Sequence, residues 1–321
     1  MTRGNRSRAP HRALLVRAML AGAASIALGS TALAQGGQPR DPRSIGGGNC
    51  SANPYNCVDA VNPLPAPNTV WMEEMTWMDV RDALKAGKTT AIIATGGMEP
   101  NGPWLVTGKH NYVLHTNCEA IARKLGNALC APIVKFVPEG NISPASGHMA
   151  SPGTISMREE TFRNVLTDLV HSLKVHGFTK IILIGDSGGN QAGQRWVADS
   201  VTKLWQGSPI VAHIQEYYDY ASVAKHMEQF GVHQTVAEGL HDDPEISLNM
   251  FIDDPKSIRY DERAKAKLLT INGVSLADRK KATEWAKQIV EFRTKVTIEA
   301  IEKAVANKGT LPAPPRRPAG N

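Results

Sequence analysis

Residues 181–190 constrain the fold of this chain more than any other stretch. The apolar run from Ile181 to Ile184 predicts a buried strand. It ends at the turn Gly185-Asp186-Ser187-Gly188-Gly189, and a helix-like segment follows over residues 191–205. In α/β proteins such a turn projects side chains above the carboxyl end of the sheet, where ligands bind. We therefore expect residues that carry chemistry in this turn.

Three interpretations of this turn compete. Its residues match those around the nucleophile of trypsin-like serine proteases, but that fold consists of antiparallel barrels. The strand–helix alternation here excludes it. The turn also satisfies the Gly-x-Ser-x-Gly pattern of a nucleophile elbow, in the strand–turn–helix context that this motif requires. The third interpretation is a turn at a metal site, and it depends on the family resemblance described below.

Strands and helices alternate along most of the chain. Strands are predicted over residues 89–95, 132–137, 180–184 and 209–214, and helices over residues 76–86, 115–128, 159–176, 191–205 and 279–305. This order predicts a single α/β domain over residues 71–306, with a mostly parallel sheet flanked by helices on both faces. Residues 35–70 are rich in Gly, Pro and Asn and predict an irregular N-terminal arm. Residues 307–321 predict a Pro-rich, disordered tail.

The first 34 residues have the pattern of a secretory signal peptide. Five arginines precede or begin an apolar run over residues 18–28, and Ala32-Leu33-Ala34 follows as a cleavage site. We expect a Sec-type signal with cleavage after Ala34, and a periplasmic or secreted chain without membrane attachment. Cleavage lowers the formal charge from +6 to about +1, so the basic balance gives no indication of nucleic-acid binding. About 285 residues remain, enough for one large core.

The chain has four cysteines, an even number that suits disulfides in an exported protein. Cys50 and Cys57 flank a short polar loop, and we predict that they pair. Cys118 and Cys130 are a second candidate pair, provided that their Cβ geometry allows it. A zinc site built from all four is disfavoured, because the sequence has no Cys-x-x-Cys spacing.

Four segments occur in the same order as the motifs of a known family. Residues 99–110 correspond to Glu-x-His-Gly-Pro-His-Leu-Pro-x-x-x-Asp, and residues 147–156 end in the matching Gly-Thr-Ile-Ser. Residues 177–190 end in Ser187-Gly188-Gly189-Asn190, where the motif has His-Gly-Gly-Asn, and His241 with Glu245-Ile246-Ser247 echoes a later motif. From about residue 71 to 304 the chain resembles the creatininase (creatinine amidohydrolase) family. The resemblance implies that family's fold, a small-molecule substrate, and a homo-oligomer, often a hexamer.

The resemblance also implies a metal site, but one with altered ligands. Family members hold two ions, and of the matching positions only Glu99 is kept. The others carry Asn101 for histidine, His110 for aspartate, Ser187 for histidine, and Gly189 where a carboxylate can stand. Two dications close together need bridging anionic ligands. We therefore predict at most one divalent ion, Zn or Mn, with Glu99, His110 and Asp186 as its ligands, or with His148 in the place of Asp186.

Three functions remain open at this point. The first is hydrolysis of a cyclic amide or another C–N bond in a small molecule, with Glu99, Ser187 and His148 as catalytic residues. Substrate-binding roles then fall to a second set of residues, Asn101, Trp104, Asn190, His241 and Glu245. The second is a metal-independent serine hydrolase in which Ser187 is the nucleophile, with His148, His110 or His241 as its base. The third is a non-catalytic periplasmic binding or assembly protein on the same fold.

The segment His241-Asp242-Asp243-Pro244-Glu245 has two interpretations of its own. It can form a metal cluster, or it can be an exposed acidic loop, which is the more common outcome for such a run. We expect the exposed loop.

Overall fold

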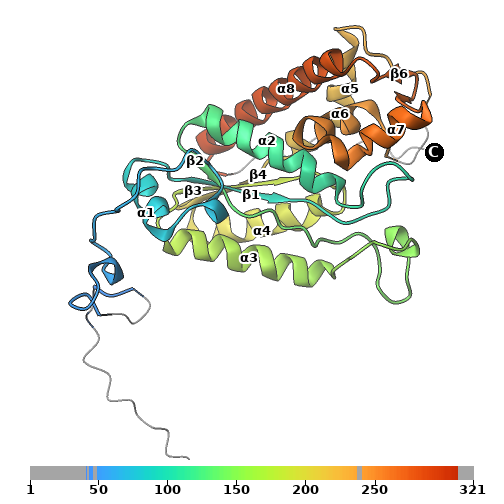
Figure 1. Ribbon diagram of the computed structural model, residues 1–321. Coiled ribbons are helices and arrows are strands. Elements are labelled where there is room, and N and C mark those ends of the chain that lie inside the picture. The colour runs from blue at the N-terminus through green and yellow to red at the C-terminus, as the bar shows by residue number, and fades with distance from the viewer. Residues whose placement is uncertain (1–40, 42, 46–48, 237–240, 310–321) are drawn as a thin grey trace, which may run out of the picture. The chain divides into compact units, whose positions relative to one another are not determined.

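The computed structural model describes residues 41, 43–45, 49–236 and 241–309 (Figure 1). The predicted signal peptide and residues 310–321 of the predicted tail lie outside the described residues. The chain divides into two units, one up to Val61 and one from Asn62 onward, and each is described by itself.

The first unit is irregular and contains one disulfide. Its only regular element among the described residues is the 3₁₀ helix Pro54–Asn56, which Asn53 caps by accepting a hydrogen bond from the Tyr55 backbone. The Cys50–Cys57 disulfide links the chain before this helix to the residue that follows it, and the two Cα atoms are 5.4 Å apart. The predicted pairing of these cysteines is confirmed.

A four-stranded parallel sheet forms the centre of the second unit. Its strands are β1 (Thr90–Thr95), β2 (Ala128–Cys130), β3 (Lys180–Gly185) and β4 (Ile210–His213), in the order β2-β1-β3-β4. The chain leaves β1 toward one edge and leaves β3 toward the other. The point between β1 and β3 is therefore a topological switch point, where open α/β sheets bind ligands at the carboxyl ends of their strands.

Helices cover both faces of this sheet, so the predicted fold class is confirmed (Figure 1). In chain order they are α1 (Trp77–Lys85), α2 (Lys109–Leu125), α3 (Glu159–Val175), α4 (Asn190–Trp205), α5 (Tyr220–Glu228), α6 (Pro244–Asp253), α7 (Tyr260–Ala266) and α8 (Arg279–Ala306). A small hairpin, β5 (Thr270–Ile271) with β6 (Val274–Ser275), precedes α8.

The core follows the two-residue period of the strands. Ile92 and Ile182 face one way and pack with residues of α2 and α8. Their neighbours Ile93 and Leu183 face the other way and pack with residues of α3 and α4. Because both faces are covered, the strands are apolar throughout rather than alternating. A third cluster of buried residues joins α5, α6, α7 and the first half of α8.

Three sequence-based expectations in this unit were wrong. The second strand is Ala128–Cys130 rather than residues 132–137, where the described bridges at Val134 and Val137 are isolated. Helix α2 begins at Lys109, six residues earlier than expected. The segment 241–245 is not an exposed acidic loop: the side chains of Asp242 and Glu245 are 6% and 7% exposed, and α6 begins at Pro244.

A second disulfide, Cys118–Cys130, links α2 to β2 with the Cα atoms 6.3 Å apart. Both predicted disulfides are therefore present, which indicates an oxidising, extracytoplasmic compartment. Among the described residues, every helix is too short or too polar to cross a bilayer.

Candidate active site

A cavity of about 1290 Å³ lies at the carboxyl ends of β1 and β3. Its walls come from the loop after β1, the first turn of α2, the loop 138–148, residues 156–161, the turn after β3, the segment with Tyr218 and Tyr220, and the segment that leads into α6. The cavity therefore occupies the switch point of the sheet, and side chains from seven segments of the chain converge to line it.

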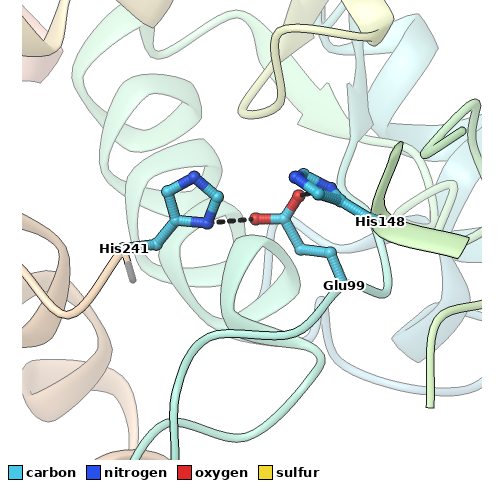
Figure 2. Close-up of side chains that lie close together, drawn as sticks. All are labelled: Glu99, His148 and His241. Atoms are coloured by element: carbon cyan, nitrogen blue, oxygen red, sulfur yellow. Dashed lines mark ion pairs between the residues drawn. The ribbon is translucent and has the colours of Figure 1, made fainter. Parts of the chain in front are cut away.

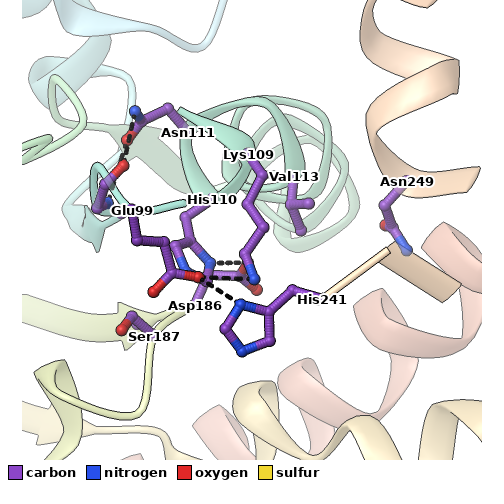
Figure 3. Close-up of polar contacts among 12 residues, drawn as sticks. Glu99, Lys109, His110, Asn111, Val113, Asp186, Ser187, His241 and Asn249 are labelled. Atoms are coloured by element: carbon purple, nitrogen blue, oxygen red, sulfur yellow. Dashed lines mark hydrogen bonds and ion pairs between the residues drawn. The ribbon is translucent and has the colours of Figure 1, made fainter. Parts of the chain in front are cut away.

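Glu99 is the centre of this convergence and is 2% exposed. Its Oε1 atom lies 2.8 Å from Lys109 Nζ, 3.0 Å from His110 Nε2 and 3.1 Å from His241 Nδ1. Its Oε2 atom lies 2.6 Å from His148 Nδ1. Figure 2 shows His148 and His241 on opposite sides of the carboxylate, and Figure 3 shows Lys109 and His110 reaching it from the start of α2.

Asn101 holds the loop that carries Glu99. Its amide nitrogen donates to the backbone oxygens of Glu99 and Val106, at 2.9 and 3.2 Å. The Glu99 backbone N–H donates in turn to Thr107. Asn101 was predicted to bind substrate. Its side chain instead hydrogen-bonds the backbone of the Glu99 loop, and it is not among the described residues that line the cavity.

Asp186 lies directly behind His110. Its Oδ2 atom is 2.9 Å from His110 Nδ1, and its Oδ1 atom accepts from Tyr220 Oη and from Arg293, both at 2.8 Å. Arg293 reaches this point from α8 and also donates to the Tyr217 backbone oxygen. A carboxylate that binds the far nitrogen of a histidine fixes the ring's orientation and tautomer. Asp186 therefore orients His110, which in turn faces Glu99.

Glu139 is the residue of this site that sequence reasoning missed. It follows an apolar run in a segment without a matched motif, so no local signal distinguished it. Ser187 Oγ donates to its Oε2 atom at 3.4 Å, and His148 Nδ1 lies 3.5 Å from the same atom. Burial, together with the nearby charge of Glu99, raises the pKa of Glu139 to about 8.

Gly189 has no room for a side chain. A Cβ atom at this position would overlap the backbone oxygen of Pro138. The turn therefore cannot carry a carboxylate at residue 189. Glu139, the neighbour of Pro138, instead brings a carboxylate to this turn from another loop.

Asn190 and Trp104 are also placed away from the cavity. The Asn190 amide donates to the backbone oxygens of Thr95 and Gly96, both at 2.9 Å, and so ties the end of β1 to the start of α4. The Trp104 ring lies 5.5 Å from the guanidinium carbon of Arg263. Neither residue is among those that line the described cavity.

His241 and Glu245 do line the cavity. His241 has a left-handed backbone, with φ at 60°, and the next residue, Asp242, forms a buried ion pair with Arg263 at 2.6 Å. Glu245 accepts a hydrogen bond from Gln234. Burial raises the pKa of Glu245 to about 7.

The charges around Glu99 are strongly coupled. Burial alone would raise its pKa, but the adjacent rings of His110 and His241 and the charge on Lys109 hold that pKa well below the usual range. Burial alone would lower the pKa of His110, yet Asp186 and Glu99 raise it. At neutral pH Glu99 is therefore a carboxylate surrounded by cationic or hydrogen-bonding groups.

The donor atoms of this site fit a divalent cation. Several of them are buried and lack a hydrogen bond of proper geometry, although they face one another: Glu99 Oε1, His110 Nε2, Glu139 Oε1, His148 Nδ1 and His241 Nδ1. They fall into two groups of three that share Glu99, one with His148 and His241 and one with His110 and Glu139. Imidazole and carboxylate ligands suit Zn and Mn.

The fold and this site together define a parallel α/β protein with a buried carboxylate–histidine cluster whose residues could hold a metal ion. The family model for creatininase, described as creatinine amidohydrolase, matches residues 73–307. The chain therefore belongs to the creatininase family.

Two curated relatives are similar over part of the chain. A 3-dehydro-scyllo-inosose hydrolase of Thermotoga maritima is 26% identical over 177 residues, which cover 54% of this chain and 53% of that protein. A creatinine amidohydrolase of Pseudomonas putida is 22% identical over 116 residues, which cover 36% of this chain and 44% of that protein. The chain thus spans about half the length of these relatives or less.

Solved structures show the same fold. A manganese creatininase superposes with a TM-score of 0.56 and 17% identity, over 74% of this chain and 98% of that one. A mutant creatininase of the Zn–Zn type superposes with a TM-score of 0.53 and 16% identity, over the same shares. A further mutant creatininase, with a TM-score of 0.54 and 17% identity, over the same shares of the two chains, is complexed with creatine.

Proposed function

We propose that this protein is an exported, metal-dependent hydrolase that opens a C–N bond of a cyclic amide or a related ring in a small molecule. The observation that carries the proposal is the set of buried, unsatisfied carboxylate and imidazole atoms that converge on Glu99 inside a large cavity. The family supports a hydrolase, and the named substrates of its relatives are small molecules.

We assign one divalent ion to Glu99, His148 and His241. The two histidine side chains are 38% and 40% exposed, so an ion held there borders the open part of the cavity. A catalytic ion needs such a position, because water and substrate must reach its remaining coordination sites. This assignment gives His148 and His241 a ligand role and leaves Asp186 as the group that orients His110.

Such an ion supplies a Lewis acid for the reacting carbonyl and lowers the pKa of a bound water. The chain's own residues supply proton transfer and orientation. Glu139 lies beside His148 and Ser187 within the cavity, where its carboxyl group could accept a proton and return it during hydrolysis. Ser187 donates a hydrogen bond to one Glu139 oxygen and so helps to orient the carboxyl group.

The serine-hydrolase alternative is less well supported by these contacts. A serine nucleophile needs a general base within hydrogen-bond reach. Ser187 Oγ donates to Glu139, and none of its described hydrogen bonds involves a histidine. A non-catalytic binding protein differs from both alternatives in one respect: it would show no turnover on any member of a substrate panel.

The test combines metal analysis with a substrate panel. The purified protein, loaded with Zn or Mn and freed of excess metal, is assayed on cyclic amides, cyclic ureides and ring ketones, before and after chelation. We expect turnover that chelation abolishes and metal restores. His148→Ala and His241→Ala should lose metal and activity, whereas His171→Ala, which removes a ring packed on Trp205 outside the cavity, should keep both. Serine-directed labelling of Ser187 with full activity in chelator would overturn the proposal.

We also propose that the signal peptide is cleaved after Ala34 and that the mature protein forms a homo-oligomer. The support is the Arg-rich, apolar N-terminus, the disulfides and the family resemblance. N-terminal sequencing of the exported protein should give Gln35 as the first residue. The molar mass measured by light scattering should exceed that of the monomer. A chain that begins at Met1, or a monomer at micromolar concentration, would contradict the respective claim.

A further inference from the structure

Lys109 is the most unusual residue of the site. Its side chain is 2% exposed, and its ammonium lies 2.8 Å from Glu99 Oε1 (Figure 3). Removing an ammonium from water is unfavourable unless a counter-charge replaces the lost hydration. Glu99, the shared member of both candidate ligand groups, is that counter-charge.

The position of Lys109 in its helix is unfavourable as well. It is the first residue of α2, next to His110, and the first turn of a helix carries a partial positive charge. Cations are stabilised at the opposite end, where Arg123 and Lys124 stand in this helix. Lys109 and His110 thus place two adjacent cationic side chains at the helix end where cations are unfavourable. Departures of this kind from local preference are typical of functional sites.

Lys109 and His110 both lie against one oxygen of Glu99. The inner ligand group, Glu99 with His110 and Glu139, is wholly buried. An ion bound there would stand beside the Lys109 ammonium, and like charges at that range repel strongly in a buried site. The outer group, Glu99 with His148 and His241, lies in a more open place. His148 faces Glu99 Oε2, whereas His241 lies 3.1 Å from Oε1, the oxygen that Lys109 contacts. Both histidine side chains are partly exposed, so solvent screens the repulsion between Lys109 and an ion there.

We infer that Lys109 is a built-in cation that takes the place of a second divalent ion. It neutralises Glu99 from the inner side, keeps a dication out of the Glu99–His110–Glu139 group, and limits the centre to one ion on the outer group. This inference rests on the proposed function, since it concerns the same centre.

The experiment counts metal ions per chain. Wild-type protein, Lys109→Met, Lys109→Arg and the surface variant Lys174→Met are saturated with Zn and passed through gel filtration, and bound Zn is measured by mass spectrometry. Lys174 contacts the ring of Trp205 and controls for the loss of a lysine elsewhere. We expect one Zn per chain in the wild type, Lys109→Arg and Lys174→Met, and two in Lys109→Met.

Circular dichroism identifies any variant that fails to fold, and two further readouts then decide. Wild-type protein that binds two Zn overturns the inference without any variant. The double substitution of Lys109→Thr with His110→Asp removes both cations and adds an anion, and it should also bind two.

The outcomes separate this inference from the proposed function. One Zn in both the wild type and folded Lys109→Met overturns the role of Lys109 and leaves the metal-dependent hydrolase intact. No Zn in the wild type but one in Lys109→Met supports the exclusion and overturns the metal-dependent function. No Zn in either overturns both.

Discussion

The backbone oxygen of Pro138 fills the space where Gly189 would carry a side chain. This contact joins the turn after β3 to the loop that carries Glu139. It explains how a carboxylate, that of Glu139, comes to face Ser187 although residues 187–189 are only serine and glycine. The carboxylate comes from a different part of the sequence.

Substitution at Gly189 should therefore damage the fold rather than rebuild a ligand. Gly189→Ala should lower the free energy of unfolding by about 1–3 kcal/mol, because the overlap with Pro138 involves backbone that must shift. Gly188→Ala is the matched control, since its Cβ meets only the movable ring of Tyr218. Denaturant unfolding of both variants measures this. Equal stability of the two would contradict the contact.

Glu139 should act in catalysis without holding the outer ion. Glu139→Gln keeps the shape of the side chain but cannot exchange a proton. We expect kcat to fall by about 10²- to 10⁴-fold, the usual contribution of a general acid or base, with metal content unchanged. Steady-state kinetics and metal analysis of the same sample test this. A loss of metal equal to that in His241→Ala would make Glu139 a ligand instead.

Arg293 should be required for stability because Asp186 is fully buried. Arg293→Met leaves the Asp186 carboxylate without its guanidinium partner, and breaking a buried pair in this way costs about 3–5 kcal/mol. Arg163→Met is the control, since it removes a half-buried (i, i+4) pair with Glu159 near the surface, and such a pair contributes only about 0.3–0.5 kcal/mol. Thermal or chemical unfolding should separate the two. Similar losses of unfolding free energy in the two variants would show that burial of Asp186 does not require Arg293.

Glu245 should make stability fall as pH rises. Its pKa is about 7 in the folded chain against 4.5 in the unfolded one, so between these values the folded state binds more protons. Stability is therefore lost from about pH 4.5 to 7, by up to ~3 kcal/mol. Glu245→Gln removes this dependence and should gain stability relative to wild type at pH 8 but not at pH 4. Unfolding curves across this range, with exposed Glu228→Gln as control, measure it. An unchanged pH profile would refute the assignment.

The sequence carried enough information for the fold class and for three of the four strands of the sheet. Apolar runs such as Ile181–Ile184 and turns at glycine are local signals, and burial on both faces of a parallel sheet makes them strong. The Cys50–Cys57 pair was also predictable, because its loop is short, whereas Cys118–Cys130 was a candidate whose geometry only the structure supplies. Residues 132–137 were wrongly predicted as a strand because a short apolar run resembles one. Pro132 has no N–H group to donate to the hydrogen bonds between strands.

The site was less predictable because its residues come together only in three dimensions. Lys109 and His110 begin a helix whose first turn is polar, so periodicity could not locate that start. Asp243-Pro244 is a helix-start signal, with Pro at the first helical position, but the acidic residues around it suggested an exposed loop. Glu139 has no local signal, since its role depends on a turn about 50 residues away in the sequence.

The central claim is that one divalent ion is held by Glu99, His148 and His241. The most direct measurement is an anomalous difference map from crystals of the Zn-loaded wild-type protein, recorded at the zinc absorption edge. The account predicts one peak per chain, within bonding distance of Glu99, His148 Nδ1 and His241 Nδ1. A peak between Glu99, His110 and Glu139, two peaks, or none in fully loaded crystals would contradict it.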